Sequence, residues 1–216
     1  MGIVTKSATE KSIWKYLCDR LGNACGVAGL MGNLYAESAL RADNLQNTYE
    51  KKLGYTDAEY VRAVDSGAYT NFAKDGAGFG LAQWTYWSRK QNLLQFAKGK
   101  GKSIGDLSMQ LDFLLQELKT SYSAVYRVLT SAKSVKEASD AVLLQFERPA
   151  DQSAAAQHRR AAYGQAYYDA YADSLGADLA VLVQKGVIST PAYWLQTAPR
   201  VQYLPELIHN MAVKLQ

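Results

Sequence analysis

An apolar segment that contains glycines and ends in a carboxylate constrains this chain more than any other stretch. From residue 24 to residue 38 the sequence reads ACGVAGLMGNLYAES. On a period of 3.6 residues, Leu30 and Leu34 share one helical face, and Glu37 continues that face three residues beyond Leu34. The segment therefore predicts a core helix whose last turn carries a glutamate.

Glycines punctuate the same predicted helix. Gly26, Gly29 and Gly32 lie on roughly one side of it, and each costs about 1 kcal/mol relative to alanine in a helix interior. We expect this cost to be offset by another element packed very close to that side. Periodicity leaves two readings of Glu37 open, a buried acid or a carboxylate just past the core that reaches water, since glutamates are rarely buried without a partner.

The rest of the chain predicts a mainly α fold. Capping boxes at Ser7–Glu10 and Ser134–Glu137 mark two helix starts. No strand pair is convincing, apart from possible short strands between residues 43 and 80. The predicted helices span about residues 8–21, 24–38, 57–65, 88–98, 107–119, 135–148 and 155–171, with further helices after Pro191 and Leu204.

A long loop, from Asp43 to Gly80, is the longest weakly structured part of the chain. Long ordered loops in compact domains are usually functional. This one ends in the sequence DGAGFGLAQW, residues 75–84, which holds three glycines in five residues and would let the backbone approach a ligand closely. The alternative is a plain turn into the next helix, and the residues alone leave both readings open.

A composition shift after Ala172 suggests a domain boundary. The sequence DSLG at 173–176 separates a first domain, 1–172, from a small helical C-terminal module, 173–216. About 40 residues is near the lower limit for an independent core. We therefore expect the module to pack on the first domain or on another copy of itself.

Charge and hydropathy exclude several classes of function. The net charge of +4 is spread along the chain and does not form the dense basic stripe expected for nucleic acid, although it suits an acidic surface such as a bacterial wall. No apolar run approaches the ~20 residues of a membrane helix, so we expect no membrane insertion. The first residues also lack the features of a secretory signal.

Metal and cofactor binding are not expected. Cys18 and Cys25 are the only cysteines, and no spacing suits zinc. We expect two buried thiols, with a disulfide only if the turn at Gly22 brings them together. His158 and His209 lie far apart in sequence without a ligand-like pattern around either.

Three segments then carry a family resemblance. GNLYAES at 32–38, GFGLAQWT at 78–85 and FERP at 146–149 occur in this order, and together they resemble the phage tail lysozyme family over about residues 8–172. The resemblance implies a lysozyme-like, mostly helical two-lobed fold that cuts the β-1,4 bond between the amino sugars of peptidoglycan. It also implies action on the cell wall, after release from the host cytoplasm or as part of a virion.

The resemblance assigns roles to particular residues. In the wider lysozyme superfamily the catalytic glutamate ends a buried helix, which is the position of Glu37. Residues 80–83 resemble the Gly-Leu-Met-Gln motif of goose-type lysozymes and lytic transglycosylases, with Ala82 in place of methionine, so Gln83 is expected to line the glycan cleft. Ala39 departs from the glycine expected after Glu-Ser. The further candidates for substrate binding are Tyr35, Phe79, Gly80 and Trp84.

A second catalytic carboxylate is left open. Glycosidases protonate the leaving oxygen with one carboxyl group and use a second as base or nucleophile, whereas transglycosylases use the sugar's own hydroxyl. Asp65 and Asp75 lie in the long loop region, and Asp75 is favoured because it precedes the glycine-rich turn. Glu147 is the third candidate, although its place beside Arg148 at a helix end fits a structural ion pair better.

We therefore predict a peptidoglycan glycosidase of the N-acetylmuramidase type with Glu37 as general acid. A lytic transglycosylase using the same glutamate is the nearest alternative. An alternative of another class is a non-catalytic wall-binding or tail structural protein. Three roles stay open for the C-terminal module: docking to wall material, packing on the first domain, and self-association.

Overall fold

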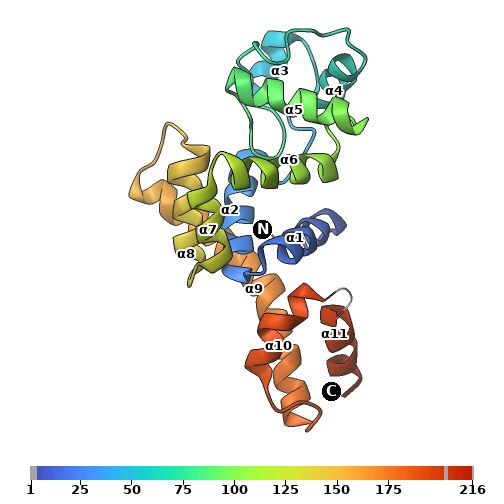
Figure 1. The fold of residues 1–216 in the computed structure, drawn as a ribbon, viewed down its shortest axis with the longest axis vertical. Coiled ribbons are helices and arrows are strands. Elements are labelled where there is room, and N and C mark those ends of the chain that lie inside the picture. Colours follow the sequence, from blue (N-terminus) through green and yellow to red (C-terminus); the bar gives the residue numbers. More distant parts are fainter. Residues whose placement is uncertain (1–3, 202–203, 216) are drawn as a thin grey trace. The chain divides into compact units, whose positions relative to one another are not determined.

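A computed structural model describes residues 4–201 and 204–215, and it confirms the predicted mainly α class (Figure 1). The chain divides into two compact units. Unit 1 combines Met1–Asn33 with Ala124–Gln216, and unit 2 comprises Leu34–Ser123. Within the described residues, no helix is both long enough and apolar enough to cross a membrane.

Unit 1 begins with helix α1, whose ends follow the predicted local signals. The Ser7 hydroxyl accepts the N–H of Glu10, and the Glu10 carboxylate accepts the N–H of Ser7, which completes the predicted capping box. The helix ends at Gly22, which has a φ of 63°. The helices of unit 1 are α1 (Ala8–Leu21), most of α2 (Ala24–Ser38), α7 (Ser123–Ser131), α8 (Val135–Ala141), η1 (Val142–Glu147), α9 (Ala154–Gln184), α10 (Pro191–Thr197), η2 (Ala198–Arg200) and α11 (Leu204–Leu215).

The glycines of α2 lie where other helices come very close, as predicted. A Cβ atom added to Gly26 would stand 1.8 Å from a carbonyl oxygen of α7. At Gly29 it would stand 2.6 Å from a side chain of α8, and at Gly32 it would stand 2.4 Å from a backbone nitrogen of α9. These distances are far below van der Waals contact, so three neighbouring helices pack directly on the α2 backbone.

A buried polar network joins α2, α8 and α9 and was not predicted. Asn33 is fully buried, and its Nδ2 donates to the carbonyl oxygen of Gly29 at 2.9 Å and to the carbonyl oxygen of Ser139 at 3.2 Å. Its Oδ1 accepts a hydrogen bond from Arg160 at 3.3 Å. Each of these partners satisfies a polar group that burial would otherwise penalise by about 1–3 kcal/mol.

Two predicted helices have different bounds in the structure. The predicted helix 135–148 is α-helical only to Ala141 and continues as the π-helix η1. Helix α9 does not end near residue 171 but continues unbroken to Gln184, so the predicted boundary at 173–176 lies inside it (Figure 1, orange). A glycine such as Gly176 costs only about 1 kcal/mol inside a helix, which tertiary packing can offset.

The packing that extends α9 is a separate apolar cluster in the C-terminal segment. Its buried members are Leu175, Leu179, Leu182, Ala198, Ile208 and Ala212. The second half of α9 thus supplies one wall of this small core, and α10, η2 and α11 supply the rest. Arg200 donates from Nη2 to the carbonyl oxygen of Gly22 at 3.0 Å, so this segment also contacts the end of α1.

Unit 2 holds α3 (Asn47–Leu53), α4 (Asp57–Asp65), α5 (Trp87–Lys100) and α6 (Leu107–Thr120), together with the end of α2. Helix α3 was not predicted, and neither was α7 in unit 1. The possible short strands of the long loop appear as isolated antiparallel bridges that join Leu45 to Phe79 and Phe79 to Trp84. The aromatic core beside these bridges contains Tyr60, Phe72, Phe79, Trp84 and Phe113.

Candidate active site

Glu37 lies in the last turn of α2 with a partly buried side chain. The next residue, Ser38, is buried and donates from Oγ to the carbonyl oxygen of Leu81 at 2.9 Å and to that of Leu34 at 3.1 Å. Consecutive Cα atoms are about 3.8 Å apart. The Ser38 hydrogen bond therefore brings Glu37 and the turn at 80–83 to the same part of unit 2.

The turn at 80–83 is held in a tight conformation by its own backbone. Phe79 and Trp84 exchange two hydrogen bonds, of 3.2 and 3.0 Å, across its base. Gly80 has a φ of 75°, a conformation that favours glycine, and Gln83 has a φ of 42°. Both residues close the turn through a hydrogen bond of 3.1 Å from the Gln83 N–H to the Gly80 carbonyl oxygen.

The Gln83 side chain connects this turn to the preceding loop. Its Nε2 donates to the carbonyl oxygens of Asn44 at 3.1 Å and Gly80 at 3.2 Å. Its Oε1 lies on the side of Gly78, where an added Cβ would stand 2.7 Å from it and 3.2 Å from Oγ1 of Thr85. The amide nitrogen is thus used within the fold, while Oε1 lies beside Gly78. That Gln83 lines a glycan cleft stays a prediction.

Gln110 also supports the turn and was missed at the sequence level. It is fully buried, and its Oε1 accepts the N–H of Leu81 at 2.9 Å. Its Nε2 donates to the carbonyl oxygens of Ala42 at 2.7 Å and Ile104 at 2.6 Å. A signal was present, because Gln110 falls on the apolar face of the predicted helix 107–119, where a polar residue needs buried partners.

The residues after α2 adopt a strained backbone conformation. Ala39 has a φ of 53° and Leu40 a φ of 62°. The left-handed region costs a residue with a Cβ about 1–2 kcal/mol. The departure noted in the sequence, alanine in place of an expected glycine, therefore coincides with a backbone conformation that suits glycine.

We expect Ala39→Gly to raise the free energy of unfolding by about 0.5–1 kcal/mol, because relief of strain exceeds the added entropy of the unfolded chain. Urea denaturation followed by circular dichroism measures the effect. Ala36→Gly is the matched control, since Ala36 is exposed within α2 and glycine there should cost about 1 kcal/mol. A lower unfolding midpoint for Ala39→Gly would contradict the strain argument.

The structure corrects the expectation for Asp75. Its side chain is 0% exposed, and its Oδ1 lies 2.5 Å from Nζ of Lys90, which is also 0% exposed. Oδ2 accepts hydrogen bonds from the hydroxyls of Tyr60 and Tyr69. Burial lowers the pKa of Lys90 while Asp75 opposes that change, and burial together with Asp75 raises the pKa of Tyr69 to about 12. The Asp75 side chain is therefore buried among structural partners and presents no surface to substrate.

Asp65, the last residue of α4, is exposed and holds the loop between α5 and α6. Its Oδ2 accepts the Ser103 hydroxyl at 2.5 Å and its Oδ1 accepts the N–H of Ile104 at 2.9 Å. Glu147, the last residue of η1, belongs to unit 1. A catalytic role for either carboxylate stays a prediction.

The aromatic candidates differ in exposure. Phe79 and Trp84 are 0% exposed, so the expectation that their side chains contact substrate is wrong. Both side chains pack in the core of unit 2. Trp84 donates from Nε1 to a Glu117 carboxylate oxygen at 3.0 Å. Tyr35 is partly exposed on α2, and its role in substrate binding stays a prediction.

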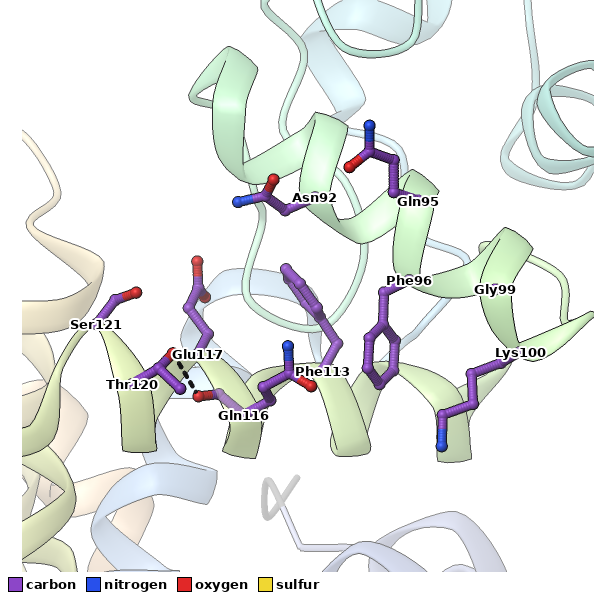
Figure 2. A pocket seen from close by; sticks show the side chains of 10 residues that line it. All are labelled: Asn92, Gln95, Phe96, Gly99, Lys100, Phe113, Gln116, Glu117, Thr120 and Ser121. Carbon is purple, nitrogen blue, oxygen red and sulfur yellow. Dashed lines mark hydrogen bonds between the residues drawn. The ribbon is translucent and has the colours of Figure 1, made fainter.

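A groove of about 480 Å³ between α5 and α6 is a separate feature of unit 2 (Figure 2). Phe96 and Phe113 lie side by side between the two helices, with ring centroids 5.5 Å apart. Neither Glu37 nor Gln83 lines it. The lining residues are Asn92, Gln95, Phe96, Gly99, Lys100, Phe113, Gln116, Glu117, Thr120 and Ser121.

In the described residues, metal-ligating side chains do not cluster, and both cysteines are free. In the parts of the chain that the structure describes, no three His, Cys, Asp or Glu side chains lie together as a metal site. Cys18 is a free, buried thiol, and burial raises its pKa to about 12. Cys25 is also free and is partly exposed.

Comparison with known proteins identifies one family. The family model described as phage tail lysozyme matches residues 8–171, about three quarters of the chain. A search of curated proteins and a search of solved structures each found no significant match. The matched span contains α1 to α8 and the candidate site at Glu37.

Proposed function

The chain belongs to the phage tail lysozyme family, and from that premise we propose that it is a peptidoglycan glycosidase of the N-acetylmuramidase type with Glu37 as general acid. The substrate is the β-1,4 bond between the amino sugars of the bacterial cell wall. Because that substrate lies outside the membrane, the protein acts after release from the host cytoplasm or as part of a virion.

One observation carries this proposal. Glu37 lies in the last turn of α2, and the hydroxyl of Ser38, the last residue of the helix, is hydrogen-bonded to the Leu81 carbonyl oxygen at 2.9 Å. A partly exposed carboxyl group thus lies on a rigid helix end that is fixed to a glycine-containing turn. A general acid must be held in one place relative to the leaving oxygen, and a helix end fixed by a buried hydrogen bond supports that requirement.

The proposed reaction begins with proton transfer from the Glu37 carboxyl group to the glycosidic oxygen. The bond between that oxygen and the sugar's C1 breaks, water supplies a hydroxyl to C1, and the remaining proton of that water passes to a carboxylate base, which leaves a new reducing end. We do not propose Asp75 as the partner, because its side chain is 0% exposed and paired with Lys90. Asp65 is the exposed carboxylate that remains in unit 2 from the original candidates, and it is the one we propose to test as base.

Product analysis tests the proposed function. Purified peptidoglycan digested with the wild-type protein is expected to release soluble fragments with new reducing N-acetylmuramic acid ends, which borohydride reduction and mass spectrometry detect. Fragments ending in 1,6-anhydro sugars would instead assign a lytic transglycosylase. Binding to the walls without any fragment release would assign a non-catalytic wall-binding protein.

A further inference from the structure

Two aromatic side chains at the start of α5 are unusually exposed. Tyr86 is 64% exposed and Trp87 is 53% exposed, whereas Trp84, three residues earlier, is fully buried. The two rings lie 6.2 Å apart between centroids, tilted by 44°. Large aromatic side chains are seldom left so open, and adjacent exposed apolar groups commonly mark an interaction site.

The backbone that carries these rings is anchored on both sides. Arg89 makes two hydrogen bonds of 2.7 Å to the Glu117 carboxylate. The next residue, Lys90, forms the buried ion pair with Asp75. Charge-assisted pairs of this kind are stronger than neutral hydrogen bonds. They therefore fix the position of the first turn of α5, which carries Tyr86 and Trp87.

Sequence continuity limits the distance between the two rings and the turn at 80–83. Trp87 follows Gln83 by four residues, so their Cα atoms are at most about 14 Å apart. Thr85 lies between them and donates from its hydroxyl to the Gln83 carbonyl oxygen at 2.9 Å. The aromatic pair is therefore an extension of the turn that Ser38 ties to the end of α2.

The chemistry of the pair suits a sugar ring. A pyranose has apolar C–H faces that pack on aromatic rings, while the Tyr86 hydroxyl and the Trp87 indole N–H supply polar edges for sugar hydroxyl or acetamido groups. Tyrosine and tryptophan also lose little conformational entropy on binding.

We propose that Tyr86 and Trp87 form a subsite that holds a sugar ring of the peptidoglycan strand during cleavage at Glu37, an inference that rests on the proposed function. The subsite binds the strand and does not take part in proton transfer. It therefore contributes equally to the bound substrate and to the transition state, and its removal acts on KM.

Direct binding is the first test. The probe is a peptide-free tetrasaccharide of alternating N-acetylglucosamine and N-acetylmuramic acid, and Glu37→Gln protein is used so that the probe is not cleaved. Adding Trp87→Ala is expected to weaken Kd about tenfold, whereas adding Trp87→Phe keeps most of the affinity. Tyr16→Ala is the matched control, since the Tyr16 ring lies on α1 under Arg20. An unchanged Kd for Trp87→Ala would overturn the subsite.

Turnover separates this inference from the proposed function. In the otherwise wild-type enzyme, Trp87→Ala is expected to raise KM about tenfold with kcat within about twofold. If Trp87→Ala cleaves peptidoglycan with the wild-type KM and kcat, the glycosidase function stands and the subsite is overturned. Trp87-dependent binding without cleavage would keep the subsite and reject the glycosidase. Concentration-dependent association lost in Trp87→Ala, with no effect on glycan binding, would assign the rings to a self-contact and overturn the subsite.

Discussion

Glu37→Gln is expected to fold like the wild-type protein and to clear bacterial walls roughly 10²–10⁴ times more slowly, the range that general acid catalysis contributes. Glutamine keeps the shape of glutamate but has no carboxyl proton to transfer. The side chain is only partly buried at the end of α2, so the free energy of unfolding should change by less than about 0.5 kcal/mol. Release of reducing ends from purified peptidoglycan measures the rate, and thermal melting confirms the fold.

A matched control distinguishes this role from a general effect of lost charge. Glu50 is also a partly exposed glutamate of unit 2, on α3. Glu50→Gln removes the same charge and should keep the wild-type rate. If folded Glu37→Gln protein still releases reducing ends at close to the wild-type rate, Glu37 is not the general acid.

Lys90→Met is expected to lower the free energy of unfolding by about 3–5 kcal/mol, the cost of leaving one partner of a buried ion pair. The Asp75 carboxylate would remain 0% exposed without its 2.5 Å contact to Nζ. It would keep the hydroxyls of Tyr60 and Tyr69, which do not compensate its charge. Urea denaturation near neutral pH measures the loss.

The exposed Lys98 on the same helix provides the control. Lys98→Met removes an equal charge from α5 and should change stability by less than about 0.5 kcal/mol. Combining Lys90→Met with Asp75→Asn should recover part of the loss, because no buried charge then remains. A Lys90→Met protein as stable as the wild type would show that the pair does not hold unit 2 together.

The helix starts and the packing face of α2 could be predicted because they depend on nearby residues. The Ser7–Glu10 capping box forms within one turn, and the glycines of α2 signal a close neighbour whatever that neighbour is. The same signals could not set the length of α9, because its second half is stabilised by residues of α10, η2 and α11. They also could not show that α8 continues as a π-helix.

Local patterns in the chain were enough to predict a mainly helical fold, the position of Glu37 near the end of a core helix, and the family resemblance. Which polar residues are buried, and which partners they contact, became visible only in the folded chain. In the sequence Asp75 is a loop carboxylate, whereas in the structure it contacts Lys90, fifteen residues later. The sequence places Gln110 in a helix but does not show that its amide bonds to the backbone of three separate loops. Local patterns record what a residue prefers, whereas the burial of a charge or an amide depends on partners that are distant along the chain.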